Sequence, residues 1–378
     1  MRGGAGLREA ARRHGVSLSV VQRWVRRAGD LPLDAVDWRE RPRARHRSSR
    51  TADRVEELVV ATRLLLRRGD LGEYGAAAIH RELEDRPDLP GPLPSLRTNG
   101  RILARRGELP ARRPRRPAPP RGWYLPEVAA RRAELDAFDA IDQESLRRTV
   151  PLDVLTGTSL HGGLVSAWPM SGLRSGHVAA RLLARWREAG LPAYAQFDND
   201  ARFIGGPSVP DSIGLVIRFC LAAGVTPVFV PPAELGWQAA IERFNGLWQE
   251  KVLARLEDPT LEELVTRSAA YVAASRARHR ARIAAAPPRR QLPADGVIDP
   301  GAPASGRILF IRRANDVGRI TILNRRLRVG EIWAHRHVRV ELDIDAGRID
   351  IFGLRRSVPD FQPHLASHPY DPPGRWFT

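Results

Sequence analysis

Two acidic segments in the middle of the chain combine residue types and spacing that suit metal chemistry. Asp198 directly follows an apolar strand pattern at 193–197, and Glu242 follows another strand pattern at 225–230. Periodicity predicts a helix over 238–253, with Glu242 in its first turns. Two such carboxylates can converge on Mg²⁺, which favours few carboxylates, several waters and a phosphate. The pattern therefore indicates phosphodiester chemistry in which two metal ions assist the attacking and leaving oxygens.

The charge balance points to nucleic acid as the partner. The chain has 61 Lys and Arg residues against 43 Asp and Glu residues, a formal net charge of +18, and Lys251 is its only lysine. Clustered arginines release counterions from phosphates and give affinity without sequence preference. No segment is apolar enough to span a membrane, no signal pattern is visible, and Cys220 is the sole cysteine. We expect a cytoplasmic protein, associated with DNA in the nucleoid if the resemblance to bacterial proteins described below holds, with no membrane partner and no disulfide.

Shifts in composition divide the chain into several domains. We expect DNA-binding helices at 1–40 and 51–107, a catalytic domain at 131–290, a small β domain at 300–356, and an irregular tail at 357–378. Residues 108–130 form a basic linker rich in Pro and Arg, which composition predicts to be stiff. The fold class is multidomain α+β.

The N-terminal segments have the pattern of helix-turn-helix units. Helices are predicted at 7–14 and 18–28, joined by a turn in which Gly15 is free to adopt a positive φ. In the second unit, Ser95 is placed to cap a helix that ends near Gly107. The outward residues predicted to contact DNA are Gln22, Arg23, Arg26, Arg27, Arg97, Arg101 and Arg105.

The central domain is predicted to begin with antiparallel strands and to continue with alternating strands and helices, which describes a ribonuclease H-like fold. Its motifs are Asp198-Asn199-Asp200, followed by Phe203, and Glu242-Arg-Phe-Asn after a Pro-Pro loop. These motifs resemble those of bacterial insertion-sequence transposases of the DDE type and of retroviral integrases. The resemblance implies Asp198 and Glu242 as metal ligands, with a first Asp on the opening strand.

The chain departs from the family pattern at three points. Asp200 stands where the family has Gly, and Gln238-Ala239 replaces Asn-Gly. The two acids also lie further apart than is usual in the family, which fits an insertion around 204–210. Asp200 either disturbs the metal site by its charge or turns toward solvent.

The first acid has three candidates on the opening strand at 135–142. Asp139 and Asp142 point to opposite faces because side chains alternate along a strand, so only one of them can join this site. We favour Asp139, with Asp142 second and Asp136 third. No histidine lies in zinc-ligand spacing, so the expected cofactor is Mg²⁺ or Mn²⁺, two ions held by Asp139, Asp198 and Glu242.

Five short alternating strands are predicted within 307–352, and they suggest an SH3-like β-barrel with a basic face. The resemblance implies a transposase that binds element ends, cuts them and joins the freed 3′-OH to target DNA, acting as a homo-oligomer on double-stranded DNA. Two alternatives stay open: a catalytically inactive DNA-binding regulator and a plain ribonuclease H-like nuclease.

Overall fold

The computed structural model describes residues 6–39, 51–109, 120–142, 152–206, 211–257, 259–292 and 296–372, and the chain divides into two compact units, 1–56 and 57–378. The first unit contains α1 (Leu7–Arg13) and α2 (Leu18–Ala28). The turn between them passes through Gly15 at φ 64°. Trp24 packs on Trp38 with ring centroids 5.6 Å apart. The predicted helix pair is confirmed; the basic segment at 41–50 lies outside the described residues.

Three helices open the second part of the chain: α3 (Asp53–Arg68), α4 (Ala76–Glu84) and α5 (Leu96–Arg105). Val59, Ile79 and Ile102 pack together in a small core, since each stands on the apolar stripe of its helix. Ser95 caps α5 as predicted, because its Oγ accepts the Thr98 N–H at 3.2 Å.

A mixed sheet forms the centre of the second unit. Its first five strands are β1 (Leu135–Ile141), β2 (Asp153–Ser159), β3 (Val165–Met170), β4 (Tyr194–Phe197) and β5 (Thr226–Phe229). They lie in the order β3-β2-β1-β4-β5, with β1, β2 and β3 antiparallel and β4 and β5 parallel to β1. Antiparallel strands that pass into parallel ones in this order confirm the predicted integrase-core-like sheet.

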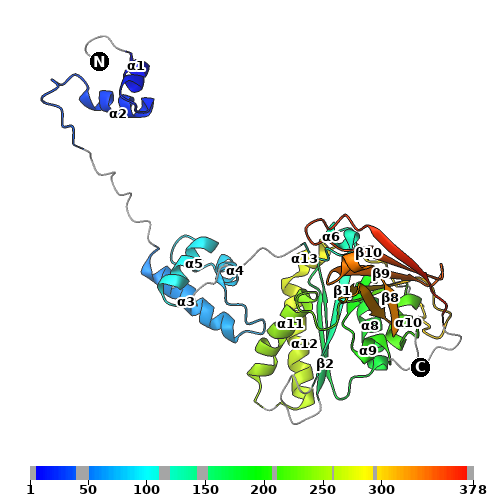
Figure 1. The fold of residues 1–378 in the computed structure, drawn as a ribbon. Helices are drawn as coiled ribbons and strands as arrows, with labels where there is room; N and C mark the ends of the chain where they lie inside the picture. Colours follow the sequence, from blue (N-terminus) through cyan, green and yellow to red (C-terminus); the bar gives the residue numbers. More distant parts are fainter. Residues whose placement is uncertain are drawn as a thin grey trace. The chain divides into compact units, whose positions relative to one another are not determined.

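Helices cover both faces of this sheet (Figure 1). One face packs against α8 (Ser175–Ala189), α9 (Ala201–Ile204) and α10 (Leu215–Ala222). The other packs against α11 (Ala239–Lys251) and α12 (Leu261–Arg278). Val128 of α6 (Pro126–Ala129) and Leu253 of the short η1 (Leu253–Arg255) join the same core, and α13 (Arg280–Ala284) follows α12. Alternation along β1 sends Phe138 to the first face and Ala137 to the second. Asp139 therefore faces α11.

The C-terminal strands extend the same sheet. They are β6 (Arg307–Arg313), β7 (Arg319–Ile322), β8 (Arg325–Arg328), β9 (His337–Asp343), β10 (Arg348–Gly353) and β11 (His364–Pro369), with the short η2 (Glu331–Trp333) before β9. β6 pairs in parallel with β5, and the order β5-β6-β9-β10-β11 completes a nine-stranded sheet. β7 and β8 form a separate two-stranded sheet.

The five predicted strands are thus confirmed, whereas the separate SH3-like barrel at 300–356 is not. The physical reason is the free edge of β5, which offers unpaired backbone groups that β6 satisfies. The apolar residues of this region also share one core with the central domain, where Phe310 stacks on Phe229 at 5.4 Å. Within the predicted irregular tail, β11 pairs with β10 as an edge strand.

Among the helices that the structure describes, none has the length and apolar composition needed to cross a bilayer.

Candidate active site

The three predicted catalytic carboxylates lie at one end of the sheet. Asp139 stands near the end of β1, and Asp198 follows the last residue of β4. The parallel register pairs Ala137 with Gln196, so the two acids lie level at the carboxyl ends of adjacent strands. Glu242 lies in the first turn of α11, the helix that packs on this face.

Asp139 is held by two donors. Its Oδ1 accepts the Ala140 N–H at 2.9 Å, and its Oδ2 accepts the Asn245 Nδ2–H at 2.7 Å. Asn245 lies on α11 one turn after Glu242, and its Oδ1 accepts the Thr156 hydroxyl at 2.7 Å. This chain of bonds ties β1 and β2 to α11 and fixes the orientation of the carboxylate.

Negative charges on neighbouring carboxylates contribute to the raised pKa values of Asp139 and Asp198. Burial raises the pKa of Asp139 to about 6, and the charges of Asp198 and Glu242 add to the rise, while the Ala140 and Asn245 hydrogen bonds oppose it. Burial also raises the pKa of Asp198, with a further contribution from the charge of Asp200. Like charges near a partly desolvated site favour the protonated form unless a cation is present. The structure therefore places Asp198 and Glu242 near enough to Asp139 for their charges to act on it.

Asp200, the departure from the family motif, is neutralised locally. It caps α9 by accepting the Arg202 N–H at 2.7 Å, and its Oδ2 pairs with the Arg202 guanidinium at 2.7 Å. Burial opposes ionisation, but these bonds outweigh it and lower the pKa of Asp200. The extra acid is thus a paired helix cap.

Glu242 is exposed, and its side chain is turned toward the loop that precedes α11. Its Oε1 accepts the Gly236 N–H in a long bond of 3.4 Å. Such a bond is weak, so rotation of the side chain toward Asp139 costs little.

The donor set fits a hard divalent cation. Three carboxylates could supply oxygen ligands, and burial together with the charges of Asp198 and Glu242 raises the pKa of Asp139, a rise that bound Mg²⁺ or Mn²⁺ would reverse. Within the ranges that the structure describes, no three His, Cys, Asp or Glu side chains lie close enough together to enclose an ion. A metal centre here therefore needs a change of rotamer, for which Glu242 is the exposed member.

The other candidates for the first acid have different surroundings. Asp136 is fully buried on the opposite face of β1, where the Arg185 Nε lies at 3.0 Å and an Arg289 nitrogen at 2.5 Å. Burial opposes its ionisation, but these two arginines hold the pKa of Asp136 well below its usual range. Asp142 follows β1, and its charge acts on Arg202. Asp139 is the candidate on which the charges of both Asp198 and Glu242 act.

Several polar residues without a predicted role support this end of the sheet. Arg312 on β6 is buried, and it donates to the Val230 carbonyl at 3.2 Å, the Thr321 carbonyl at 3.1 Å and the Asn199 Oδ1 at 2.8 Å. Burial lowers the pKa of Arg312 to about 10. Asn199 in turn donates to Val230 at 2.7 Å. The loop that carries Asp198 is therefore held by a C-terminal strand.

Asn245 belongs to the Glu242-Arg-Phe-Asn motif, so the sequence offered a signal for it. No sequence motif pointed to Arg312 or Thr156.

The predicted DNA-contacting residues lie on the surfaces of α2 and α5. All are exposed except Arg27, whose guanidinium lies 5.0 Å from the Trp24 ring and 3.4 Å from Asp37. The exposed residues are Gln22, Arg23, Arg26, Arg97, Arg101 and Arg105.

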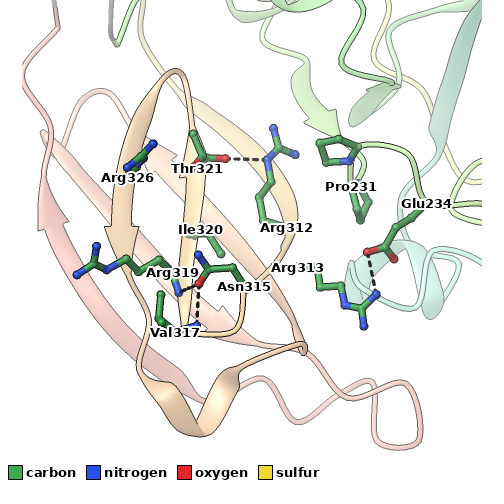
Figure 2. Close-up of a pocket in the computed structure, with 11 residues that line it drawn as sticks. Pro231, Glu234, Arg312, Arg313, Asn315, Val317, Arg319, Ile320, Thr321 and Arg326 are labelled. Carbon is green, nitrogen blue, oxygen red and sulfur yellow. Dashed lines mark hydrogen bonds and ion pairs between the residues drawn. The ribbon is translucent and has the colours of Figure 1, made fainter.

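A basic pocket of about 540 Å³ lies between the loop after β5 and the strands β6 to β8 (Figure 2). Pro231 and Glu234 form its loop side, and Arg313, Arg319 and Arg326 contribute positive charge. None of the three acids lines this pocket, but its loop side leads directly into α11.

Comparison with known proteins gives similarity of structure only. No family model matches the chain, and no curated protein matches it. Similar solved structures include a chain of the simian T-cell lymphotropic virus intasome bound to PP2A regulatory subunit B56 gamma, with 16% identity, a TM-score of 0.32, and coverage of 51% of this chain and 63% of that one. This chain thus spans less than two thirds of that relative.

Two isolated catalytic cores are also similar. The BIV integrase core has 18% identity and a TM-score of 0.28, and covers 37% of this chain and 81% of its own. The HTLV-2 integrase core in complex with magnesium has 14% identity and a TM-score of 0.27, with coverage of 35% and 81%. Because these TM-scores are low, the fold is assigned from strand order and register.

Proposed function

We propose that this protein is a DNA transposase that cuts the ends of a mobile element and joins them to target DNA. The observation that carries the proposal is the placement of Asp139 on β1 level with Asp198 after β4, on the sheet edge that faces Glu242 in the first turn of α11. Three acids at the carboxyl ends of two adjacent strands and on a neighbouring helix form the donor set for metal-dependent phosphoryl transfer. The proposed cofactor is a pair of Mg²⁺ or Mn²⁺ ions held by these three residues.

When bound, the ions would assist loss of a proton from the attacking oxygen and stabilise charge on the leaving oxygen. The chain's own residues do the positioning. Asn245 orients the Asp139 carboxylate, Arg312 fixes Asn199 beside Asp198, and Glu242 is free to rotate toward the phosphate. Water attacks first, and the freed 3′-OH then attacks the target strand in line. No covalent enzyme intermediate is required, because positioning and electrostatics carry the transfer.

The partner is double-stranded DNA. The exposed arginines of α2 and α5 would contact the element ends, and arginines of the C-terminal strands would contact phosphates without reading bases. Two ends must be held for joining, so the active form is a homo-oligomer on DNA.

The test is strand transfer with purified protein. Labelled duplexes copied from the flanks of the coding sequence would be mixed with a supercoiled plasmid and Mg²⁺ or Mn²⁺. Asp139→Asn, Asp198→Asn and Glu242→Gln should abolish joined product while binding of the flanks is retained. Asp142→Asn is the matched control, and it should stay active.

Other results separate the alternatives. Tight binding of the flanks without metal-dependent cutting would refute the enzyme and leave a DNA-binding regulator. A preference for RNA–DNA hybrids would identify a ribonuclease H-like nuclease. Loss of activity in Asp142→Asn but not in Asp139→Asn would refute the assignment of the first acid.

A further inference from the structure

The loop between α3 and α4, residues 69–75, lies against helices of the catalytic domain within the second compact unit. Arg255 of η1 donates through Nη1 to the Gly69 carbonyl at 2.8 Å and through Nη2 to the Arg67 carbonyl at 2.7 Å. Gly72 has φ 54°, and a Cβ at this position would collide with the side chains of Arg255 and Lys251. The positive φ and the close approach both require glycine here, so the loop is shaped to this surface.

Two carboxylates of the loop pair with arginines of α12. Asp70 lies 2.8 Å from the Arg267 guanidinium, and Glu73 lies 3.3 Å from that of Arg278. Glu73 also lies 3.1 Å from Arg81, on its own helical unit. The loop therefore presents negative charge to the catalytic domain, whereas the chain as a whole carries a net charge of +18.

A further contact is made by an aromatic ring. The Tyr74 ring centroid lies 4.8 Å from the Lys251 ammonium, on α11, and 4.6 Å from the Arg63 guanidinium, on α3. Lys251 is also paired with the neighbouring Glu250 at 2.6 Å. Beneath the loop, the helices α11, η1 and α12 thus gather four cationic side chains, which we call the covered basic face: Lys251, Arg255, Arg267 and Arg278.

The contacts that hold the loop are polar. The Asp70 side chain is 59% exposed and the Glu73 side chain 40% exposed. Ion pairs between exposed side chains contribute little to stability and are screened by salt. Among the described residues, the apolar core of α3 to α5 and the core beneath α11 are separate, so the loop is not anchored in either of them. A competing anion could therefore displace it.

An opening for such an anion lies beside the loop. A pocket of about 440 Å³ is lined by Leu64, Arg67 and Arg68 of α3 and by Arg255 of η1. Three of these four lining residues are arginines, and none is acidic. A row of phosphates entering the pocket would meet Arg255 at the margin of the covered basic face. Duplex DNA supplies such a row, with one full negative charge on each phosphate.

We propose that the covered basic face is a phosphate-binding surface for DNA, and that loop 69–75 occupies it until DNA takes the place of the loop. The choice of DNA as the anion rests on the proposed function. In the DNA-free chain the carboxylates of Asp70 and Glu73 stand in for phosphates. DNA releases counterions when it binds, which the loop does not, so low salt favours the exchange. Displacement of the loop also undocks α3 to α5 from the catalytic domain.

The test breaks the same ion pairs from each side and measures binding of a labelled duplex of arbitrary sequence by fluorescence anisotropy, without metal. Asp70→Asn with Glu73→Gln removes the charges of the loop and keeps the face, so the duplex should bind roughly three- to tenfold more tightly. Arg267→Gln with Arg278→Gln removes two phosphate contacts. Binding should weaken, and the slope of log K against log [salt] should become shallower by about 2.

A charge-matched control and a direct view of the loop complete the experiment. Glu84→Gln with Asp88→Asn removes two exposed acids at and just after the end of α4, and it should change the affinity far less. Hydrogen exchange of the wild type should speed up within 69–75 when the duplex is added, and exchange in the central strands should stay slow.

Several results would overturn the proposal. Equal weakening by the two double variants would mean that the ion pairs only hold the helical unit in place. An equal gain in the control variant would assign the tighter binding to net charge. A loop that stays protected on DNA would contradict the exchange itself. Loop release without metal-dependent cutting would leave the covered basic face standing and refute the transferase, whereas cutting with a protected loop would do the reverse.

Discussion

Replacing Asp139 by Asn should stabilise the protein at alkaline pH in the absence of divalent metal. Its folded-state pKa of about 6 lies roughly two units above the ordinary value, which corresponds to about 3 kcal/mol of disfavoured charge. Asparagine removes that charge. Both oxygens of Asp139 accept hydrogen bonds, from Ala140 and Asn245, and an asparagine keeps only one acceptor. The lost bond costs about 1 to 2 kcal/mol, so the net gain is about 1 to 2 kcal/mol.

The effect of Asp139→Asn on the free energy of unfolding changes sign with pH. A carboxyl group whose folded pKa is raised contributes stability below its unfolded pKa of about 4, and that contribution is lost as pH rises through about 6. The wild type should therefore lose stability across this window, while Asp139→Asn does not. Below about pH 4 the variant should be the less stable of the two, because only its lost hydrogen bond then counts.

Urea unfolding in EDTA, followed by tryptophan fluorescence, measures this difference at acidic and alkaline pH. Asp142→Asn, at the end of the same strand, is run beside it to test whether the effect belongs to Asp139. Saturating Mg²⁺ should remove the advantage of Asp139→Asn, because a bound ion stabilises only the wild type. A variant that is less stable than the wild type at alkaline pH, or a difference independent of pH, would refute the proposed concentration of charge.

Other substitutions test the supporting residues. Asn245→Ala should raise the pKa of Asp139 further and move the acid limb of the pH–cutting profile to higher pH; an unmoved limb would contradict the positioning role. Arg185→Leu should destabilise the fold by about 3 to 5 kcal/mol in thermal unfolding, since it removes a partner of the buried Asp136. The low pKa of Asp136 adds stability that is lost as pH falls below about 4, so Asp136→Asn should be less acid-sensitive than the wild type. Arg312→Lys should cost about 2 kcal/mol or more, measured by urea unfolding, because an ammonium cannot reach all the acceptors of the guanidinium; unchanged stability would argue against its role.

The elements of this protein could be predicted from the sequence because their signals are local. Helical periodicity placed α2 at its observed bounds, and alternation indicated β9 among the five strands predicted within 307–352. The edge strand β11 was not predicted, because its neighbouring prolines are typical of irregular structure and its side chains are only partly buried.

The arrangement of the C-terminal strands could not be predicted in this way. The pairing of β5 with β6 joins residues far apart in the chain, and nothing in either strand's composition specifies the partner. The same limit applies to the site. Motifs indicated Asp198 and Glu242, but the contacts of Arg312 with Asn199 depend on that long-range pairing.

The pairing of β5 with β6 also sets an order in time. Asp139, Asp198 and Glu242 all leave the ribosome before residue 312 is made. Until β6 arrives, β5 presents an open edge, and the Asn199 loop lacks the guanidinium that fixes it. A nascent chain would thus carry all three acids before β6 is made, and the proposed active centre would be organised only after β6 pairs with β5. A message truncated before β6 would yield a product that leaves the β5 edge open and is prone to edge pairing.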